Sequence, residues 1–311
     1  MAAEKIKYIY ILSQRYSGST LLSFLLATHP SISTIGERRK FYNKSIKSDA
    51  FAHHRGTLCS CGNTYKSCPY FNQIKQGLLE KVDPKLFTSN VTEFNISKNK
   101  RLNRFYQILI EKWVELKLPL SLLPFYAKVK QMNQVNQLLV EEILAIDGSS
   151  TFLDSSKSIE QIVWLHLIQK FDLYIIWLVR DPRAQVNSAL KYNSSWNTDQ
   201  AANYWKKEMI KNERILKKIG VKYIPLRYED LCENPEQKLK DIFQFVGLTS
   251  DQFSLNFRNE ERHIIGNGKM RLGKETKIVQ RLEWKNQLSQ EQIKVIENQT
   301  KDFRKFYNPE V

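Results

Sequence analysis

The chain of 311 residues is 42% hydrophobic, 12% aromatic and 26% charged, so we expect an ordinary globular protein with a sizeable core. Its four cysteines are too few for a disulfide scaffold. A run of about 18 apolar residues and a secretory leader pattern are both missing, which makes the cytoplasm the expected compartment. The net charge of +16 attracts anions, but the lysines are scattered and match no nucleic-acid-binding motif. Charge alone therefore does not choose among nucleic acid, an anionic membrane surface and phosphorylated small molecules.

Predicted strands and helices alternate along the chain. The first strand covers residues 6–12, an apolar run rich in β-branched and aromatic side chains, and a Ser/Gly turn follows it. Residues 19–28 have the polar start and apolar body of a helix, which a His-Pro pair ends. Two more strand-like runs, at residues 173–179 and 222–231, each lead into a helix. This alternation predicts an α/β fold, with a parallel sheet flanked by helices.

Residues 42–146 differ from the rest of the chain. They hold a cysteine cluster and mostly helical, polar-studded sequence without a clear strand. We therefore predict a single domain over residues 1–311, in which residues 42–146 form a mostly helical insertion over the edge of the sheet. Since substrate loops usually lie at that edge, the insertion is expected to shape the substrate pocket.

The turn after the first strand has the composition of an anion site. Ser17, Gly18, Ser19 and Thr20 stand where a strand gives way to a helix, so free backbone N–H groups and the positive end of the helix dipole converge there. Gly18 lets a phosphate approach the backbone, and the hydroxyls of Ser19 and Thr20 add donors. The Walker pattern, which needs a lysine before Ser19, and the G-x-G-x-x-G fingerprint are both absent. Alone, this turn is equally compatible with a hydroxyl-rich helix start.

A second polar turn follows another predicted strand. Arg180 comes directly after residues 173–179, and Ser188 comes eight residues later on the next helix. Both side chains can therefore face one crevice at the carboxyl edge of the sheet, where ligands of open α/β sheets bind. The planar fork of a guanidinium suits a phosphate. The alternative is a strand-end arginine that pairs with Asp181.

These two turns resemble the two cofactor motifs of the sulfotransferase family that uses 3′-phosphoadenosine 5′-phosphosulfate (PAPS). The first motif is SQRYSGSTLL and the second is LVRDPRAQVNSAL. Later segments are similar to the family's sequence after its third main strand and at its closing end: RYEDLCENPEQKLKDIFQFVGL, HIIGNGKMR and RLEWKNQL. The match runs in order over most of the chain outside residues 42–146, which makes it far more specific than one motif. The resemblance implies PAPS as sulfuryl donor, adenosine 3′,5′-bisphosphate (PAP) as product, and a small-molecule or carbohydrate acceptor.

The resemblance also assigns residues to the donor. Arg15 and residues 17–20 match the loop for the 5′-phosphosulfate. Arg180 and Ser188 match the motif for the 3′-phosphate, and Tyr228 matches an aromatic residue that approaches the adenine.

Two features of this assignment are looser. Asn267 matches a late residue that contacts the donor. The first motif departs from the family at Tyr16, because the family commonly has arginine directly before Ser-Gly, whereas Tyr16 separates Arg15 from Ser17. Either the turn is one residue wider, or Arg15 approaches the phosphate from a different angle.

The reacting groups follow from a third stretch. HPSISTIGERR is similar to the tyrosylprotein and bacterial carbohydrate-type branch of the family, in which a glutamate is the catalytic base, and this implies Glu37. A carboxylate is a plausible base where burial lifts its pKa toward neutrality, and Arg38 and Arg39 would lower that pKa unless they face the substrate. The alternative is a surface ion pair between Glu37 and these arginines. In FLDSSKS, Lys157 matches the lysine that stabilises the transferring group.

A histidine base, used in the cytosolic branch of the family, is less well supported. No histidine lies in a segment that resembles that branch's motif; the candidates are His29, His53, His54, His166 and His263. Sulfuryl transfer itself requires no metal, so we assign no metal ligand to the reaction.

Cys59, Cys61 and Cys68 form a cluster inside residues 42–146. With His54 they have the spacing H-x4-C-x-C-x6-C, which is not a standard zinc pattern and contains an awkward C-x-C. Zinc binding, a disulfide and free thiols in a packed loop all stay open.

Two other function classes remain as alternatives. A nucleotide kinase or NTPase would also use a phosphate loop, but the Walker lysine is missing. A basic nucleic-acid-binding protein would account for the charge of +16 and would bind DNA or RNA with a steep salt dependence. The sequence indicates neither the oligomeric state nor whether the acceptor is a sugar, a natural-product alcohol or amine, a lipid or a tyrosine.

Overall fold

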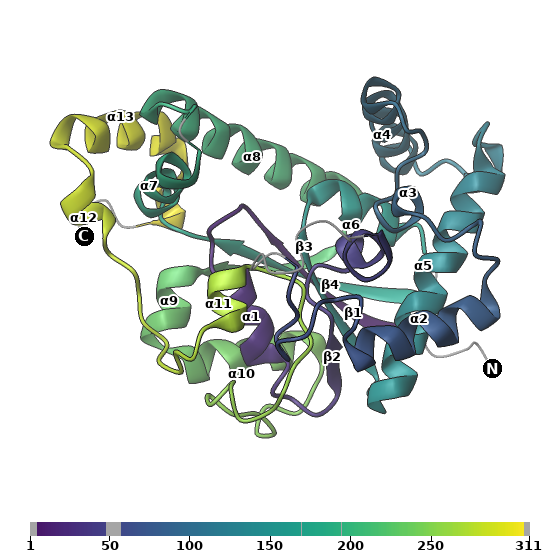
Figure 1. Cartoon of the computed structure of the whole chain (residues 1–311). Helices are drawn as coiled ribbons and strands as arrows, with labels where there is room; N and C mark the ends of the chain where they lie inside the picture. The colour runs from purple at the N-terminus through teal and green to yellow at the C-terminus, as the bar shows by residue number, and fades with distance from the viewer. Residues whose placement is uncertain (1–4, 48–56, 169, 194, 308–311) are drawn as a thin grey trace.

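The computed structural model of the chain describes residues 5–47, 57–168, 170–193 and 195–307. Parallel strands form one sheet in the order β2-β3-β1-β4-β5 (Figure 1). Their bounds are β1 Ile6–Ser13, β2 Ile32–Thr34, β3 Thr151–Lys157, β4 Phe171–Val179 and β5 Lys222–Arg227. Because β1 lies in the centre of the sheet, the turn that follows it lies in the middle of the carboxyl edge.

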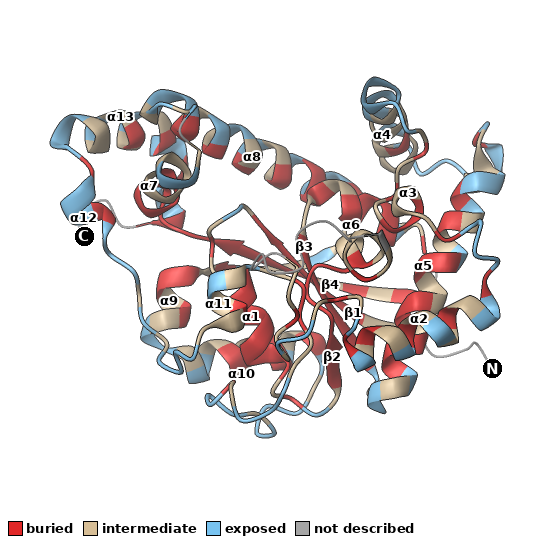
Figure 2. Cartoon of the chain, viewed as in Figure 1, coloured by how far each residue is buried: buried red, intermediate tan, exposed pale blue. Residues whose placement is uncertain are grey.

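Helices cover both faces of this sheet. One face carries α1 Ser19–Leu26, α9 Tyr228–Glu233 and α10 Pro235–Val246; the other carries α2 Pro69–Lys81, α5 Tyr126–Asp147 and α6 Ile159–His166. Since side chains alternate along a strand, Ile9 and Ile11 of β1 pack on the first group. Tyr8, Tyr10 and Leu12 pack on the second. Figure 2 shows the central strands buried between these layers, which confirms the predicted α/β fold.

The remaining helices lie toward the two ends of the sheet (Figure 1). At one end α3 Ser89–Thr92 and α4 Lys100–Glu115 lie near α2 and α5; at the other, α7 Pro182–Tyr192, α12 Trp284–Gln287 and α13 Gln290–Thr300 pack together. The long helix α8 Thr198–Ile219 contacts both groups, and α11 Gly268–Leu272 lies against α1. Short helical turns cover Arg38–Lys40, Asn43–Lys47, Leu120–Leu122 and Lys301–Phe306. Within the described ranges, no helix has both the length and the apolarity to span a bilayer.

The predicted strands at residues 6–12 and 173–179 are confirmed as β1 and β4. The third prediction, residues 222–231, is too long, since β5 ends at Arg227 and Tyr228 begins α9. Acidic residues in the first turn of α9 favour a helix start there, because they lie at the positive end of the helix dipole.

Strands β2 and β3 were not predicted. β2 has three residues, too few to show an alternating pattern. The second half of β3 contains Asp154, Ser155 and Ser156, which suggest a loop by composition but are all buried. Asp154 pairs with the buried Arg38 at 3.1 Å, so the polar half of the strand is satisfied inside the core.

The described part of residues 42–146 is largely helical. Its extended pairing, among the residues that the structure describes, is an isolated antiparallel bridge between Leu58 and Thr64. The insertion therefore adds helices α2 to α5 beside the sheet without adding a strand to it.

Candidate active site

The turn after β1 forms a cradle at the start of α1. Gly18 caps the helix with a φ of 87°, a left-handed conformation that favours glycine. A Cβ here would lie 2.4 Å from a ring carbon of Tyr228, so the position has no room for a side chain either. The first intrahelical bond runs from the N–H of Leu22 to the carbonyl of Gly18, and Gly18 has no side chain to cap the N–H groups before it. An anion can accept hydrogen bonds from these groups at the positive end of the helix.

The hydroxyl residues of this turn hold its shape. Ser17, Ser19 and Thr20 are buried. Ser17 Oγ donates to the carbonyl of Gln14 at 2.9 Å, and Thr20 Oγ1 accepts from the backbone N–H of Asn267 at 3.3 Å. The side chain of Asn267 caps α11, so this residue reaches the phosphate loop through its backbone.

Arg180 connects three parts of the predicted donor site. It follows β4, and its two Nη atoms donate to the carbonyls of Tyr16 at 2.7 Å and Arg281 at 3.2 Å. Its guanidinium lies over the ring of Tyr228, 4.8 Å from the centroid. Because the same ring covers Gly18, the structure brings Arg180, Tyr228 and the phosphate loop together.

The other two predicted donor residues do not hydrogen-bond to this group through their side chains in the described part of the chain. Ser188 Oγ donates to the carbonyl of Ala184 at 2.9 Å within α7. Arg15 is exposed and lines a cleft of about 260 Å³ beside Trp205.

Tyr16 explains how the loop differs from the family pattern. Its φ of 67° is left-handed, which is unusual for a residue with a side chain. Its ring stacks on Tyr192 with centroids 5.4 Å apart, and its carbonyl accepts a hydrogen bond from Arg180. Tyr16 therefore turns the backbone so that its carbonyl, and not its side chain, contacts the predicted donor residue Arg180.

Glu37 is buried between two lysines. It is 5% exposed, and its carboxylate oxygens lie 2.8 Å from Lys157 Nζ and 2.5 Å from Lys40 Nζ. Lys157, the last residue of β3, has a left-handed φ of 74° and pairs in the sheet with Leu12, just before the phosphate loop. The alternative of an ion pair between Glu37 and the following arginines is wrong.

The two lysines control the titration of Glu37. Burial alone would raise its pKa, but Lys157 and Lys40 outweigh burial and lower the pKa to about 2. Burial lowers the pKa of Lys157, even though Glu37 favours its charged form. The expectation of a pKa near neutrality for Glu37 is therefore wrong for the free chain, where the carboxylate is firmly ionised.

Arg38 and Arg39 have separate roles. Arg38 is fully buried and binds Asp154 at 3.1 Å and Gln161 at 2.8 Å, which makes it part of the core. Arg39 instead lines the cleft described below, and no described residue accepts a hydrogen bond from its buried Nε. Arg39, unlike Arg38, is therefore placed to contact a bound molecule.

One short segment supports both Glu37 and the phosphate loop. Ile265 pairs with Gly36, and its carbonyl accepts from the backbone N–H of Glu37 at 2.8 Å. A Cβ on Gly36 would lie 2.2 Å from that carbonyl, so the close approach requires glycine. Two residues later, Asn267 bonds to Thr20. The position of Glu37 is thereby coupled to that of the loop.

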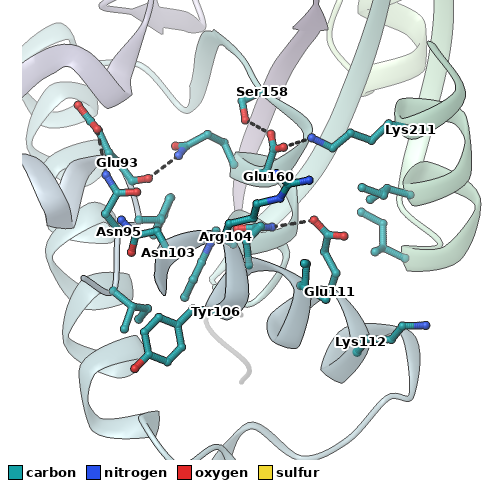
Figure 3. Close-up of a pocket in the computed structure, with 18 of the residues that line it drawn as sticks. Glu93, Asn95, Asn103, Arg104, Tyr106, Glu111, Lys112, Ser158, Glu160 and Lys211 are labelled. Carbon is teal, nitrogen blue, oxygen red and sulfur yellow. Dashed lines mark hydrogen bonds and ion pairs between the residues drawn. The ribbon is translucent and has the colours of Figure 1, made fainter. Parts of the chain in front are cut away.

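A cleft of about 860 Å³ has Arg39 in its lining, whereas Glu37 and Lys157 do not line it. Arg39 and Ser158, near neighbours of Glu37 and Lys157 in the chain, line it together with residues of α4, α6 and α8. Figure 3 shows Ser158, Glu160 and Lys211 joined by hydrogen bonds on one side. Burial raises the pKa of Glu208, another lining carboxyl. The cleft is thus lined by charged and polar groups together with apolar side chains such as Phe94, Ile108 and Trp164.

Comparison with known proteins adds the family to this geometry. A family model described as the sulfotransferase family matches residues 9–252. The chain belongs to the sulfotransferase family.

Solved structures share the fold of this sulfotransferase. The sulfotransferase domain of the olefin synthase from Synechococcus PCC 7002 is 18% identical, with a TM-score of 0.52, and the match covers 95% of this chain and 94% of that one. The sulfotransferase domain from the curacin biosynthetic pathway is 17% identical, also with a TM-score of 0.52, and the match covers 96% and 98%. No curated protein matches the chain significantly.

Three histidines lie in the described part of the chain: His29, His166 and His263. His29 is buried against Phe243 and bonds to Thr249, and His166 is exposed at the end of α6. His263 contacts two cysteines, and none of the three hydrogen-bonds to Glu37 or Lys157. His53 and His54 lie outside the described residues.

Sequence reasoning missed Lys40 and the charged lining of the cleft. Lys40 comes three residues after Glu37, a spacing that a helical turn brings to one side, so this signal was present. Glu160, Glu208 and Lys211 carry no motif, since they become neighbours only when α6 packs beside α8.

Proposed function

We propose that this sulfotransferase moves the sulfuryl group of PAPS to a hydroxyl or amine of a small-molecule or carbohydrate acceptor, with Glu37 as general base and PAP as product. The observation that carries the proposal is the Glu37–Lys157 pair beside the phosphate loop, with the 265–267 segment bonded to both Glu37 and Thr20. A proton acceptor, a cation and an anion cradle are the groups that sulfuryl transfer needs in one place.

The donor fits the residues on this side of the molecule. PAPS, when bound, supplies the sulfuryl group and a phosphate as leaving group. The backbone N–H groups after Gly18 can bind the 5′-phosphosulfate, and Arg180 with Ser188 can bind the 3′-phosphate. Tyr228, with Arg180 over its ring, offers an aromatic face beside the loop. Lys157 and Lys40 both lie beside the single carboxylate of Glu37, so positive charge exceeds negative charge here and favours an anionic donor.

Glu37 and Lys157 have different roles in the proposed reaction. Lys157 can turn from Glu37 to the sulfuryl oxygens and stabilise the charge that develops on them. Once Lys157 leaves, burial opposes only Lys40, and the pKa of Glu37 rises. Glu37 then takes the proton from the acceptor oxygen or nitrogen as the new bond to sulfur forms.

The cleft beside Arg39 is the proposed acceptor site. Its charged groups can bind the polar part of an acceptor, and its apolar side chains can pack against the rest. The Nε of Arg39, which no described residue accepts from, can donate to an acceptor oxygen. Part of the lining comes from α4, which supports the role of residues 42–146 in shaping the pocket. As part of this proposal we place the reaction in the cytoplasm, where the four free cysteines stay reduced.

Two measurements test the proposed function. In calorimetry the protein should bind PAP and discriminate against AMP, which lacks the second phosphate. With labelled PAPS and a panel of polar alcohols and amines, label should move to at least one acceptor. Equal affinity for PAP and AMP, or phosphate transfer from ATP and Mg²⁺ in place of sulfuryl transfer, would contradict the proposal.

A further inference from the structure

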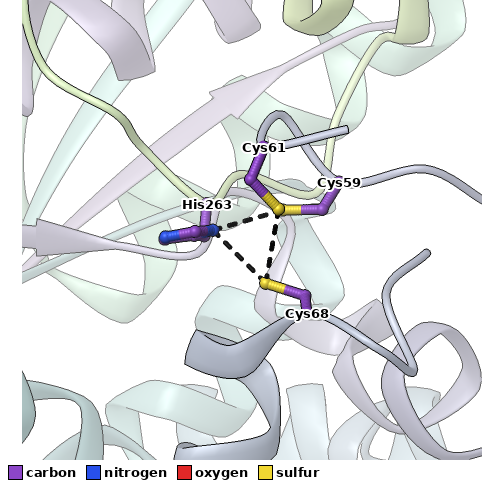
Figure 4. A group of neighbouring side chains, drawn as sticks. All are labelled: Cys59, Cys61, Cys68 and His263. Carbon is purple, nitrogen blue, oxygen red and sulfur yellow. Dashed lines mark hydrogen bonds between the residues drawn. The ribbon is translucent and has the colours of Figure 1, made fainter. Parts of the chain in front are cut away.

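Three cysteines and a histidine that sulfuryl transfer does not use come together between the insertion and the C-terminal part of the chain. One potential ligand atom from each of Cys59, Cys61, Cys68 and His263 lies within 4.8 Å of all the others. Figure 4 shows the four side chains pointing toward one another. Cys59 and Cys68 are buried, and Cys61 and His263 are half-buried. We propose that these residues bind a structural Zn²⁺ ion.

The distances are those of a tetrahedral site. With Zn–S near 2.3 Å and Zn–N near 2.0 Å, a tetrahedron has edges of about 3.8 Å between sulfurs and about 3.5 Å between sulfur and nitrogen. The Sγ atoms of Cys61 and Cys68 are 3.7 Å apart. His263 Nδ1 lies 3.5 Å from Cys59 Sγ and 3.3 Å from Cys68 Sγ. These three ligand pairs therefore have the spacing that a tetrahedral zinc ion requires, and the remaining pairs lie within 4.8 Å.

A disulfide accounts for this arrangement less well. A disulfide needs two sulfurs about 2.05 Å apart and leaves the third cysteine and the histidine without a reason to converge. The separation of 3.7 Å between Cys61 and Cys68 suits two ligands of one ion better than a covalent bond. The sequence left zinc, a disulfide and free thiols open with His54 as fourth group; His54 lies outside the described residues, and His263 takes its place.

The donor set selects the ion and its role. Thiolates and imidazole are soft or borderline ligands that favour zinc over magnesium or calcium, which prefer oxygen. Four protein ligands close a tetrahedral site and leave no position for a substrate, which is the pattern of structural zinc. Binding displaces the three thiol protons to solvent, since cysteine binds the metal as thiolate.

The local backbone is shaped for this cluster. The loop folds back so that the N–H of Cys59 donates to the carbonyl of Asn63 at 2.7 Å, and Gly62 has a left-handed φ of 85°. This turn lets the closely spaced Cys59 and Cys61 point to the same side. The ring of His263 stacks on Tyr70 at 4.7 Å, which fixes its orientation with Nδ1 toward the sulfurs.

Zinc at this position would fix the segment that holds the backbone of Glu37. His263 stands two residues before Ile265, whose carbonyl accepts from the N–H of Glu37. The loop also bonds directly to this segment, since Tyr65 Oη donates to the carbonyl of Ile264 at 3.1 Å. The ion therefore joins the insertion to the segment that positions the base, without contacting the substrate.

The first test measures metal in the full-length protein, prepared without a histidine tag and dialysed against metal-free buffer. We expect about one zinc per chain by mass spectrometry of the metals. Replacement by Co²⁺ should give the intense visible bands of a tetrahedral, thiolate-bound ion. Removal with a strong chelator should lower Tm and free three further thiols for titration. A zinc-free protein that does not take up added Zn²⁺ overturns the proposal, whether it shows four reactive thiols or only two.

Variants assign the ligands. Cys68→Ser and His263→Ala should each weaken zinc affinity at least about tenfold, measured by competition with a coloured chelator. Cys232→Ser is the control, because Cys232 lies on α9 outside the cluster, although it is half-buried whereas Cys68 is buried. It should keep the zinc content of the unmodified protein. Should a ligand variant fail to fold, the zinc content and thiol count of the unmodified chain still decide whether the cluster binds zinc. Full zinc affinity in a folded Cys68→Ser variant would contradict the assignment.

Discussion

The proposed donor and acceptor sides of this sulfotransferase are built in different ways. On the donor side, the turn after β1 supplies the consecutive residues 17–20 and the turn after β4 supplies Arg180, and Tyr228 contacts both by covering Gly18 and lying under Arg180. On the acceptor side, the cleft is lined by Arg39, residues 93–96 and side chains spaced along α4, α6 and α8. An anion cradle needs neighbouring backbone N–H groups, so it leaves a motif in the sequence, whereas a cleft between helices does not.

Glu37 stands where the two sides meet. Lys157 belongs to the sheet edge that carries the phosphate loop, and Arg39 belongs to the cleft. Variants at this junction and on either side of it should therefore separate donor binding, chemistry and acceptor binding.

The largest effect is expected for Glu37→Gln. The amide keeps the size of the carboxyl but cannot take the acceptor proton, so kcat should fall roughly 10²–10⁴-fold. PAP affinity should stay unchanged or rise, because Lys157 no longer has a carboxylate partner to leave. Steady-state kinetics and calorimetry measure the two effects.

The control for this variant is Glu160→Gln. Glu160 also pairs with a lysine, Lys211, but it lies on the acceptor cleft rather than beside Lys157. It should raise the acceptor KM more than it lowers kcat. Near-normal turnover in Glu37→Gln would remove Glu37 as the base.

Arg180→Ala should give the next largest effect. Loss of a partly desolvated, two-pronged phosphate contact is worth on the order of 2–4 kcal/mol, so PAP affinity should fall roughly 30- to 1000-fold in calorimetry. Arg180→Lys keeps the charge but not the planar fork, so its PAP affinity should lie between that of the unmodified protein and that of Arg180→Ala. An unchanged affinity in Arg180→Ala would sink the 3′-phosphate assignment.

The same contrast explains what the sequence could predict. The α/β fold, β1, β4 and the phosphate turn follow from apolar runs and local residue types, and the structure has them. β3 was missed because Asp154 and its neighbouring serines look like a loop until Arg38 is known to pair with Asp154 in the core. His263, 195 residues from Cys68, could not be assigned to the cysteines by spacing.

The pKa of Glu37 was the other property that the sequence could not predict. The expectation for Glu37 considered the adjacent arginines, but Arg38 turns into the core and two lysines take its place. Residues adjacent in the chain often face opposite sides, so the charged groups that surround a carboxylate can be identified only from the structure.

Arg39→Ala should act on the acceptor alone. Removing a charged donor from the cleft should raise the acceptor KM about tenfold, which corresponds to about 1.4 kcal/mol, while PAP affinity stays unchanged. Arg101→Ala is the charge-matched control, since Arg101 is exposed on α4 and does not line the cleft. If Arg39→Ala weakened PAP instead, Arg39 would belong to the donor side.

The smallest expected effect is a difference between the pH profiles of kcat/KM and kcat. The acid limb of kcat/KM reports the free enzyme, where the pKa of Glu37 is about 2, so Glu37 should contribute no limb to kcat/KM between pH 5 and 8. The acid limb of kcat reports the complex. In the complex, Lys157 has turned to the sulfuryl group, so the pKa of Glu37 is higher than in the free enzyme. The acid limb of kcat should therefore appear at a higher pH than that of kcat/KM.

The comparison requires an alcohol acceptor, because a protonated amine would produce a limb of its own. As pH falls, kcat should drop while kcat/KM for PAPS, which reports the donor-free enzyme, holds; Glu37→Gln should show neither change, since an amide does not titrate in this range. A kcat profile that is flat to the same low pH as kcat/KM would mean that Lys157 stays with Glu37 throughout turnover. Lys157 would then hold the carboxylate ionised instead of serving the sulfuryl oxygens, and Lys40 or Arg39 would have to take that part.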